Sequence, residues 1–282
     1  MPLLACPPII FGCAWKGART AGLVHEALDA GFRAIDTAAQ PKHYHEESAG
    51  DGVAAWLAAR SAPRSSLWLQ TKFTPLAGQD ASKPLPYDPS TPLAAQVAAS
   101  AASSLRNLRT DYLDCLILHS PCARPSDTLA VWRAFEALHA SGAVRALGIS
   151  NIYDADALAA LYASAAVKPS AVQNRFYADS GYDAGVRAFC AAHGIAYQAF
   201  WTLTANPRLL ASPLVARVAA ARKGTRAQAL FALLRAVGAT PLCGTTDAAH
   251  MREAVAAAAE WPPVAAADAA EFVSLLAAES RG

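Results

Sequence analysis

Apolar and polar positions along this chain form two kinds of segment that alternate from one end to the other. Short runs rich in apolar and β-branched residues are each followed by a longer stretch rich in Ala and Leu. The short runs are typical of buried strands, and the longer stretches are typical of helices. The alternation therefore predicts βα units arranged around a parallel sheet.

Eight strand segments and eight helical segments are predicted. The strands are PPIIFGC, FRAID, LWLQTK, DCLILHS, VRALGIS, AVQNRF, IAYQAF and ATPLCG. The helices run from Thr20 to Ala30, Glu46 to Ala59, Pro92 to Leu108, Thr128 to Ala140, Ala155 to Ala163, Asp183 to His193, Arg226 to Ala236 and Ala248 to Ala258. Eight such pairs within about 250 residues match an α/β fold of the (β/α)8 TIM-barrel type. A doubly wound sheet fits the alternation as well, but no GxGxxG follows the first strand, so the barrel is favoured.

Two loops and the end of the chain depart from the repeat. The stretch FTPLAGQDASKPLPYDPSTP after the third strand is rich in Pro, Gly and Asp, which predicts a long excursion rather than a helix. A second excursion, FWTLTANPRLLASPLVARV, follows the seventh strand. Long βα loops of a barrel lie at its C-terminal face, where barrel enzymes carry out their chemistry. Residues from about 265 to 280 are predicted to form one more helix outside the barrel of a single domain that spans residues 1–282.

The composition of the chain mainly excludes classes of partner and of targeting segment. Of the 282 residues, 54% are apolar and 16% are charged, and with a formal net charge of +2 and no run of Lys or Arg, nucleic acid is not an expected partner. The opening MPLLACPPIIFG is too short and too rich in Pro for a signal peptide. No segment reaches the roughly 18 to 20 uninterrupted apolar residues of a membrane span. We expect a soluble, cytoplasmic protein with no membrane partner.

The six cysteines show neither CxxC spacing nor a pairing with nearby His that would indicate zinc. We expect reduced thiols, most of them buried, in a reducing compartment. Cys243 could be redox-sensitive, but a thiol at a strand end is more often inert packing.

Three ionisable residues end three different predicted strands: Asp36, Lys72 and His119. Such a residue at the end of an apolar strand costs free energy unless it is paired. Because these strand ends meet at the same rim of a barrel, the three side chains are expected to form one site. Tyr44, in the loop just after Asp36, can reach the same rim.

These four residues suit the reduction of a carbonyl. Asp36 and Lys72 can form an ion pair, and an ammonium close to the Tyr44 oxygen is expected to lower a pKa that starts near 10. Tyr44 would then donate a proton near neutral pH, and neutral His119 could orient or polarise the same substrate oxygen. Carbonyl reduction also needs a hydride, which no side chain supplies, so a nicotinamide is required.

A run of further polar residues surrounds Tyr44: His43, His45, Glu46 and Glu47. The run could suggest metal ligands, but its position before a helix favours first-turn acids for the two glutamates, and no metal is predicted. Either histidine could compete with Tyr44 as the acid.

Aromatic residues fall in the predicted rim loops: Trp15, Phe73, Tyr87 and Trp201. Aromatic walls suit an apolar carbonyl substrate, and equally these residues could pack beneath the loops. Substrate contact is expected first for Trp15 and Trp201.

With these residues in place, the chain resembles the aldo-keto reductases, which are NADP-dependent (β/α)8-barrel oxidoreductases, over nearly its whole length. The motifs that carry the resemblance are IDTAAQPKHY, LQTK, DYLDCLILHSP, LGISN, VQNRFY and PLCGTTDAAHMREA, in this order. The stretches QPKHY and FWTLTANP resemble a less familiar branch of that family. Tyr44 follows Asp36 at a wider spacing than in the commonest members.

The resemblance implies a catalytic tetrad of Asp36, Tyr44, Lys72 and His119 in the roles argued above. It also implies an aldehyde or ketone as substrate, NADPH as cofactor with NADH as the alternative, and a monomer. Ser150, Asn151 and Gln173 would hydrogen-bond the nicotinamide carboxamide, and Phe200, or Trp201 beside it, would stack on the ring. The implied cofactor contacts are Gly12, Cys13, Ser150, Asn151, Gln173, Phe200, Trp201, Leu203, Gly244, Thr245, Thr246, His250, Arg252 and Glu253.

The segment GTTDAAHM would bind the adenosine 2′-phosphate, because Gly244 and Thr245 open a helix whose first amides and dipole favour an anion. His250 stands where many family members carry an arginine, and Ala254 replaces a common asparagine. Arg252 is nearby and could substitute. An ordinary strand-to-helix turn with a Thr or Asp cap is the alternative interpretation of the same residues.

Two other functions stay open at the level of sequence. A barrel lysine such as Lys72 can act as the nucleophile of a Schiff-base lyase, although a paired Asp36 would keep its amine protonated. A dinucleotide-binding regulatory subunit is the non-enzymatic alternative.

Overall fold

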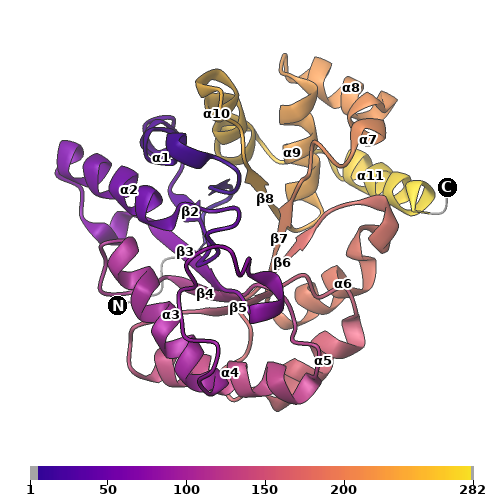
Figure 1. Cartoon of the computed structure of the whole chain (residues 1–282). Coiled ribbons are helices and arrows are strands. Elements are labelled where there is room, and N and C mark those ends of the chain that lie inside the picture. The colour runs from indigo at the N-terminus through magenta and orange to yellow at the C-terminus, as the bar shows by residue number, and fades with distance from the viewer. Residues whose placement is uncertain (1–5, 281–282) are drawn as a thin grey trace.

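The computed structural model describes residues 6–280, and in this part of the chain eight parallel strands close into a barrel surrounded by helices (Figure 1). The strands pair in chain order, and β8 closes the barrel against β1. The prediction of a (β/α)8 barrel is confirmed. The strands are β1 (Ile10–Gly12), β2 (Ala34–Asp36), β3 (Trp68–Phe73), β4 (Cys115–Leu118), β5 (Leu147–Ser150), β6 (Ala171–Arg175), β7 (Ala196–Phe200) and β8 (Ala239–Cys243).

Each predicted helix is present, with bounds that differ by a few residues from the prediction. These helices are α1 (Thr20–Asp29), α2 (Glu46–Arg60), α3 (Leu93–Asn107), α4 (Pro125–Ala140), α5 (Ala155–Ser164), α6 (Ala184–His193), α9 (Arg226–Ala236) and α10 (Ala248–Val255). The predicted C-terminal helix is α11 (Ala266–Glu279), which lies outside the barrel beside α8 (Pro213–Ala221) and α9 (Figure 1).

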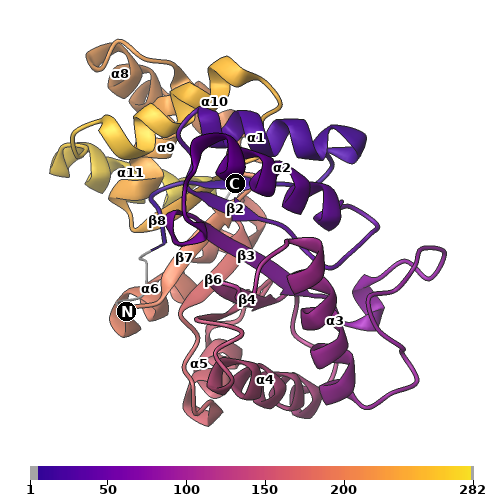
Figure 2. The same ribbon diagram turned by 90° about the vertical axis from the view of Figure 1, so that its left-hand side faces the viewer.

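The sequence prediction was wrong for part of the second excursion. The segment after β7 contains two helices, α7 (Pro207–Ala211) and α8, where a loop was expected. Each begins with a proline, which is tolerated in the first helical turn because the missing N–H has no partner there. Helix α4 begins at Pro125, earlier than predicted, for the same reason. The other excursion, between β3 and α3, holds only the short 3-10 turn Leu76–Gly78 and extends beside α3 in Figure 2.

Close packing of α2 against its neighbours depends on a glycine. A Cβ atom on Gly50 would lie 1.9 Å from the backbone oxygen of Asn107 at the end of α3. Only a residue without a side chain fits at this contact. Gly22 of α1, in contrast, has no heavy atom within 4 Å of the position of its Cβ.

The interior of the barrel is apolar at one end and polar at the other. Ile10, Ala34, Cys115, Ile117 and Ala171 form an apolar cluster inside the strands. Buried polar side chains lie nearer the carboxyl ends of β2, β3, β6 and β7. None of the helices in residues 6–280 is long and apolar enough to cross a membrane.

Candidate active site

A cavity of about 660 Å³ opens at the carboxyl ends of the strands. Six strands contribute residues to its walls: β1, β2, β5, β6, β7 and β8. The rest of the walls comes mainly from the loops that follow β1, β2, β4, β5, β7 and β8. The volume falls in the range of ligand pockets, and the C-terminal face is where a barrel is expected to carry its site.

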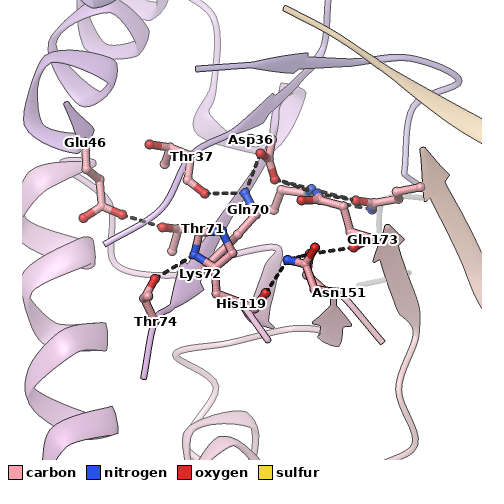
Figure 3. A network of polar contacts seen from close by, with 12 residues as sticks. Asp36, Thr37, Glu46, Gln70, Thr71, Lys72, Thr74, His119, Asn151 and Gln173 are labelled. Atoms are coloured by element: carbon pink, nitrogen blue, oxygen red, sulfur yellow. Dashed lines mark hydrogen bonds and ion pairs between the residues drawn. The ribbon is translucent and has the colours of Figure 1, made fainter. Parts of the chain in front are cut away.

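Lys72 and Asp36 form a buried ion pair at the floor of this cavity (Figure 3). Lys72 Nζ donates to Asp36 Oδ2 at 2.5 Å and to the backbone oxygen of Thr37 at 2.9 Å. Burial by itself would lower the pKa of Lys72, but Asp36, Tyr44 and Cys13 outweigh burial and raise it. The amine of Lys72 is therefore protonated at neutral pH.

Tyr44 and His119 meet above this pair. The two rings make an edge-to-face contact with their centroids 6.0 Å apart, and Lys72 Nζ lies 5.1 Å from the centroid of the Tyr44 ring. Tyr44, His119 and Asp36 line the cavity, whereas Lys72 lies behind them. The four residues that the sequence assigned to one rim are thus close together.

The pKa of Tyr44 shifts in the direction opposite to the one expected from the sequence. Burial raises the pKa of Tyr44 above 10, and the charge of Lys72, which lowers it, does not fully compensate. An ammonium lowers the pKa of a nearby phenol, but the loss of solvent around this phenol raises it by more. Tyr44 is therefore fully protonated at neutral pH.

His119 is held neutral. The pKa of His119 is lowered to about 3, mainly by burial and in addition by the charge of Lys72. Its Nδ1 lies 2.7 Å from Thr74 Oγ1, which fixes the orientation of the ring. The expectation of a neutral, hydrogen-bonding imidazole agrees with this geometry.

Gln70 and Gln173 hold the second oxygen of Asp36 (Figure 3), and Gln198 joins them in a layer of three glutamines. Gln70 and Gln173 donate to Asp36 Oδ1 at 2.7 and 2.9 Å, and both also donate to Gln198 Oε1. Gln70 and Gln198 were missed in the sequence. The signal was present, because Gln70 precedes Lys72 by two positions and therefore points to the same face of its strand.

The residues expected around a nicotinamide line the same cavity: Ser150, Asn151, Gln173, Phe200 and Trp201. Asn151 Nδ2 donates to the backbone oxygen of His119 at 2.8 Å, and Ser150 Oγ donates to the backbone oxygen of Gln173 at 2.5 Å. The amide nitrogen of Gln173 donates to Asp36 Oδ1 and to Gln198 Oε1. The amide nitrogens of Asn151 and Gln173 thus already donate to protein acceptors.

The residues expected at the adenosine phosphate are divided between two places. Gly244 and Thr245 line the cavity, as do Gly12 and Leu203. The other expected contacts lie outside its lining: Cys13 is buried behind the wall, and Thr246, His250, Arg252 and Glu253 lie just before or on α10.

The first amides of α10 already have an acceptor. Asp247 caps this helix, and its Oδ1 accepts from the backbone N–H groups of Ala249 and His250 at 2.8 and 3.0 Å. The Asp cap that the sequence left as the alternative interpretation is therefore present. These amides do not offer an open anion site.

The loops around Tyr44 and after β1 bring two aromatic rings together at the mouth of the cavity. Trp15 is 64% exposed, and its ring lies over that of His43 with the centroids 3.7 Å apart. His43 lines the cavity, but its pKa is lowered, mainly by burial, so the ring is neutral at neutral pH. His45 does not line the cavity. Neither histidine is placed as well as Tyr44 to deliver a proton.

Glu46 has a buried environment that its position in the sequence did not indicate. Both Glu46 and Glu47 lie in the first turn of α2, as predicted, but Glu46 is buried. It accepts hydrogen bonds from Thr71, Ser104 and Asn107, and burial raises its pKa against the effect of these donors. Among residues 6–280, no group of His, Cys, Asp or Glu side chains has the arrangement of a metal site.

Phe73 and Tyr87 pack beneath the first excursion rather than facing the cavity. Both are buried, their ring centroids are 5.5 Å apart, and Tyr87 donates to the backbone oxygen of Thr74 at 2.7 Å. Trp15 and Trp201 line the cavity, and Trp201 is 47% exposed.

All six cysteines are free thiols. Burial raises the pKa of Cys243, as it raises that of Cys13 to about 12, so neither is a reactive thiolate at neutral pH. The burial of Cys243 therefore favours a packing role for this thiol over a redox role.

Comparison with known proteins decides the family. The model of the aldo/keto reductase family matches residues 16–262. The chain belongs to the aldo/keto reductase family. The sequence-based predictions of this family and of a carbonyl oxidoreductase that uses a nicotinamide dinucleotide are thereby confirmed.

Two curated relatives and one solved structure give the range of similarity. The chain is 30% identical to an uncharacterised oxidoreductase of Schizosaccharomyces pombe, over 82% of this chain and 74% of the relative. It is 29% identical to the methylglyoxal reductase DkgB of Escherichia coli O157:H7, over 74% of this chain and 70% of the relative. An aldo-keto reductase of the silkworm Bombyx mori, solved in complex with NADP, has a TM-score of 0.79, with 22% identity over 97% of this chain and 89% of that chain.

Proposed function

We propose that this chain is an NADPH-dependent reductase that converts aldehydes or ketones to alcohols, with Tyr44 as the proton donor. The observation that carries the proposal is the contact of Tyr44 and His119 above the buried Lys72–Asp36 pair, on the wall of a large cavity. This arrangement delivers a proton to an oxygen atom placed between the phenol and the imidazole.

The residues around the cavity fit a nicotinamide dinucleotide. Ser150, Asn151 and Gln173 contribute hydroxyl and amide groups to the lining of the cavity, and Phe200 and Trp201 contribute aromatic rings. The bound NADP of the silkworm neighbour supports NADPH as the cofactor. When bound, the nicotinamide supplies the hydride that no side chain can provide.

The protein's own part in the reaction is to hold and move one proton. Tyr44 is protonated at neutral pH because burial raises its pKa. After Tyr44 gives its proton to the carbonyl oxygen, the ammonium of Lys72, 5.1 Å from the ring centroid, stabilises the phenolate that remains. Asp36 keeps Lys72 charged and in place. Neutral His119 can hold the same carbonyl oxygen by a hydrogen bond.

The geometry argues against the lyase alternative. Lys72 is 1% exposed, it does not line the cavity, and its pKa is raised. A Schiff base requires a deprotonated amine that the substrate can reach. Lys72 meets neither requirement.

The substrate is proposed to be a small aldehyde or ketone. The exposed rings of Trp15 and Trp201 give the mouth of the cavity an apolar surface, which suits a carbonyl compound with little charge. The relationship to a methylglyoxal reductase supports including dicarbonyl compounds among the candidates. We further infer a monomer located in the cytoplasm, where six unpaired thiols are compatible with the reducing environment.

The test is a titration of the purified chain with NADPH and NADH, followed by measurement of NADPH consumption with a panel of carbonyls that includes methylglyoxal. We expect submillimolar affinity for NADPH and turnover with at least one aldehyde or ketone. Tight binding of dinucleotide with no turnover on the whole panel would instead favour a regulatory subunit. Borohydride trapping of an adduct on Lys72 would favour the lyase.

A further inference from the structure

Two cations on the loop between β1 and α1 lie against the segment that follows β8. The ammonium of Lys16 donates to the backbone oxygen of Gly244, and the guanidinium of Arg19 donates to that of Thr246 at 3.5 Å. Lys16 also lines the cavity, together with Gly244 and Thr245. Although far apart in sequence, these two loops are neighbours because β1 and β8 pair at the closure of the barrel (Figure 1).

The position of Lys16 depends on the glycine opposite. A Cβ atom on Gly244 would lie 3.5 Å from Lys16 Nζ, so a longer side chain at this position would occupy the space that the ammonium fills. The segment after β8 carries no Lys or Arg before Arg252. The positive charge that lines this wall of the cavity therefore comes from Lys16, in the loop between β1 and α1.

Both cations lack an anionic partner. In residues 6–280, their polar partners are backbone oxygens, and no carboxylate lies within ion-pair distance of either. Burial lowers the pKa of Lys16, and the nearby charge of Arg19 lowers it further. Since an anion between the two groups would neutralise this repulsion, the pair is suited to hold one.

The α10 N-terminus is a poorer place for the same anion. Asp247 already occupies the amides of Ala249 and His250, and its carboxylate would repel a phosphate. His250 and Arg252, which the resemblance offered for this role, lie outside the lining of the cavity, as does Arg19. Arg19 enters the argument through its hydrogen bond to the backbone oxygen of Thr246, next to the lining residues Gly244 and Thr245. Lys16 is the cation that faces the cavity at this wall.

We propose that Lys16 and Arg19 bind the 2′-phosphate of NADPH and so set a preference for NADPH over NADH. This inference rests on the proposed function. A phosphate monoester carries close to two negative charges at neutral pH, which matches a pair of cations, whereas each phosphate of the pyrophosphate carries one. The guanidinium and the ammonium are both established donors to phosphate oxygens.

The test measures binding without catalysis. The double variant Lys16→Met/Arg19→Gln is compared with Lys83→Met/Arg133→Gln, which removes the same two charges from exposed positions outside the cavity. Dissociation constants for NADPH, NADH and adenosine 2′,5′-bisphosphate are measured by calorimetry at low salt. We expect the first double variant to bind NADPH and the bisphosphate at least about tenfold more weakly, with NADH changed less than about threefold.

A second variant separates a charge effect from a change of loop structure. Lys16→Arg keeps the charge and should retain most of the preference for NADPH, and all variants should unfold within a few degrees of the parent. Equal losses for NADPH and NADH, or no loss for either, would overturn the assignment of the 2′-phosphate to Lys16 and Arg19 while leaving the proposed function intact. If the parent chain bound neither dinucleotide, the proposed function would fail together with this inference.

Discussion

Lys72 Nζ lies 2.5 Å from Asp36 Oδ2, and the two side chains are 1% and 3% exposed. A buried ion pair is stable only when the remaining polar atoms of both groups are also satisfied. Here the Thr37 backbone oxygen accepts a second hydrogen bond from Lys72, and the amides of Gln70 and Gln173 donate to the other oxygen of Asp36. The pair is therefore a fixed charge arrangement beneath Tyr44.

Breaking this pair from one side should be costly. In Asp36→Asn, Lys72 is left as a buried cation without a counter-charge, and we expect unfolding to require about 3–5 kcal/mol less free energy at pH 7. Urea unfolding of Asp36→Asn, Lys72→Met and the double variant measures the coupling between the two positions. The double variant should lose less than the sum of the single variants. Strictly additive losses would show that the pair is not coupled.

Replacing Tyr44 by Phe removes the proton donor and little else. We expect turnover to fall by about 10²–10⁴-fold, the usual contribution of a general acid, with the affinity for NADPH changed less than about threefold. Steady-state rates and a dinucleotide titration check both parts. Tyr162→Phe, in α5 on the outer ring of helices, is the matched control and should keep parental turnover. A Tyr44→Phe enzyme with parental rates would point to another acid such as His43.

The neutral state of His119 should make the protein less stable in acid. Because its pKa falls from 6.5 in the unfolded chain to about 3 in the folded protein, only the unfolded chain binds this proton between those values. The stabilising contribution is complete above about pH 6.5 and declines as the pH drops toward 3, by at most about 1.4 kcal/mol per pH unit. Urea unfolding at pH 7, 6, 5 and 4.5 should show the parent losing stability relative to His119→Asn. Parallel curves for the two proteins would contradict a buried neutral imidazole.

Two helical glycines should respond to alanine in opposite ways. Gly50→Ala forces a Cβ atom against the backbone oxygen of Asn107, and we expect a loss of about 1–3 kcal/mol in unfolding free energy. Gly22→Ala meets open space and should stabilise α1 by about 0.5–1 kcal/mol. Thermal or urea unfolding of the two variants gives the comparison directly. A neutral Gly50→Ala would show that α2 and α3 can separate at this contact.

The order of strands and helices could be predicted from sequence because each element is specified by its own local pattern. The strand-end positions of Asp36, Lys72 and His119 carried the site prediction, since parallel strands bring their carboxyl ends to one rim. Local pattern failed at Pro207 and Pro213, because proline marks loops and helix starts alike and only the packing of α7 and α8 distinguishes the two.

The state of each site residue depended on contacts that no local pattern contains. The pKa of Tyr44 is the balance between burial and the charge of Lys72, and the balance requires knowing how much solvent the fold removes. Likewise Gln173 points its amide to Asp36, from which it is separated by 137 positions in the chain.

What the sequence determined by itself was the alternation of strands and helices, and hence which residues reach the rim of the barrel. Tertiary structure alone decided which of those residues touch, as when Lys16 meets Gly244 across the β1–β8 closure. The physical reason is that backbone periodicity is fixed by nearby residues, whereas burial, charge pairing and free space arise from segments that only folding brings together.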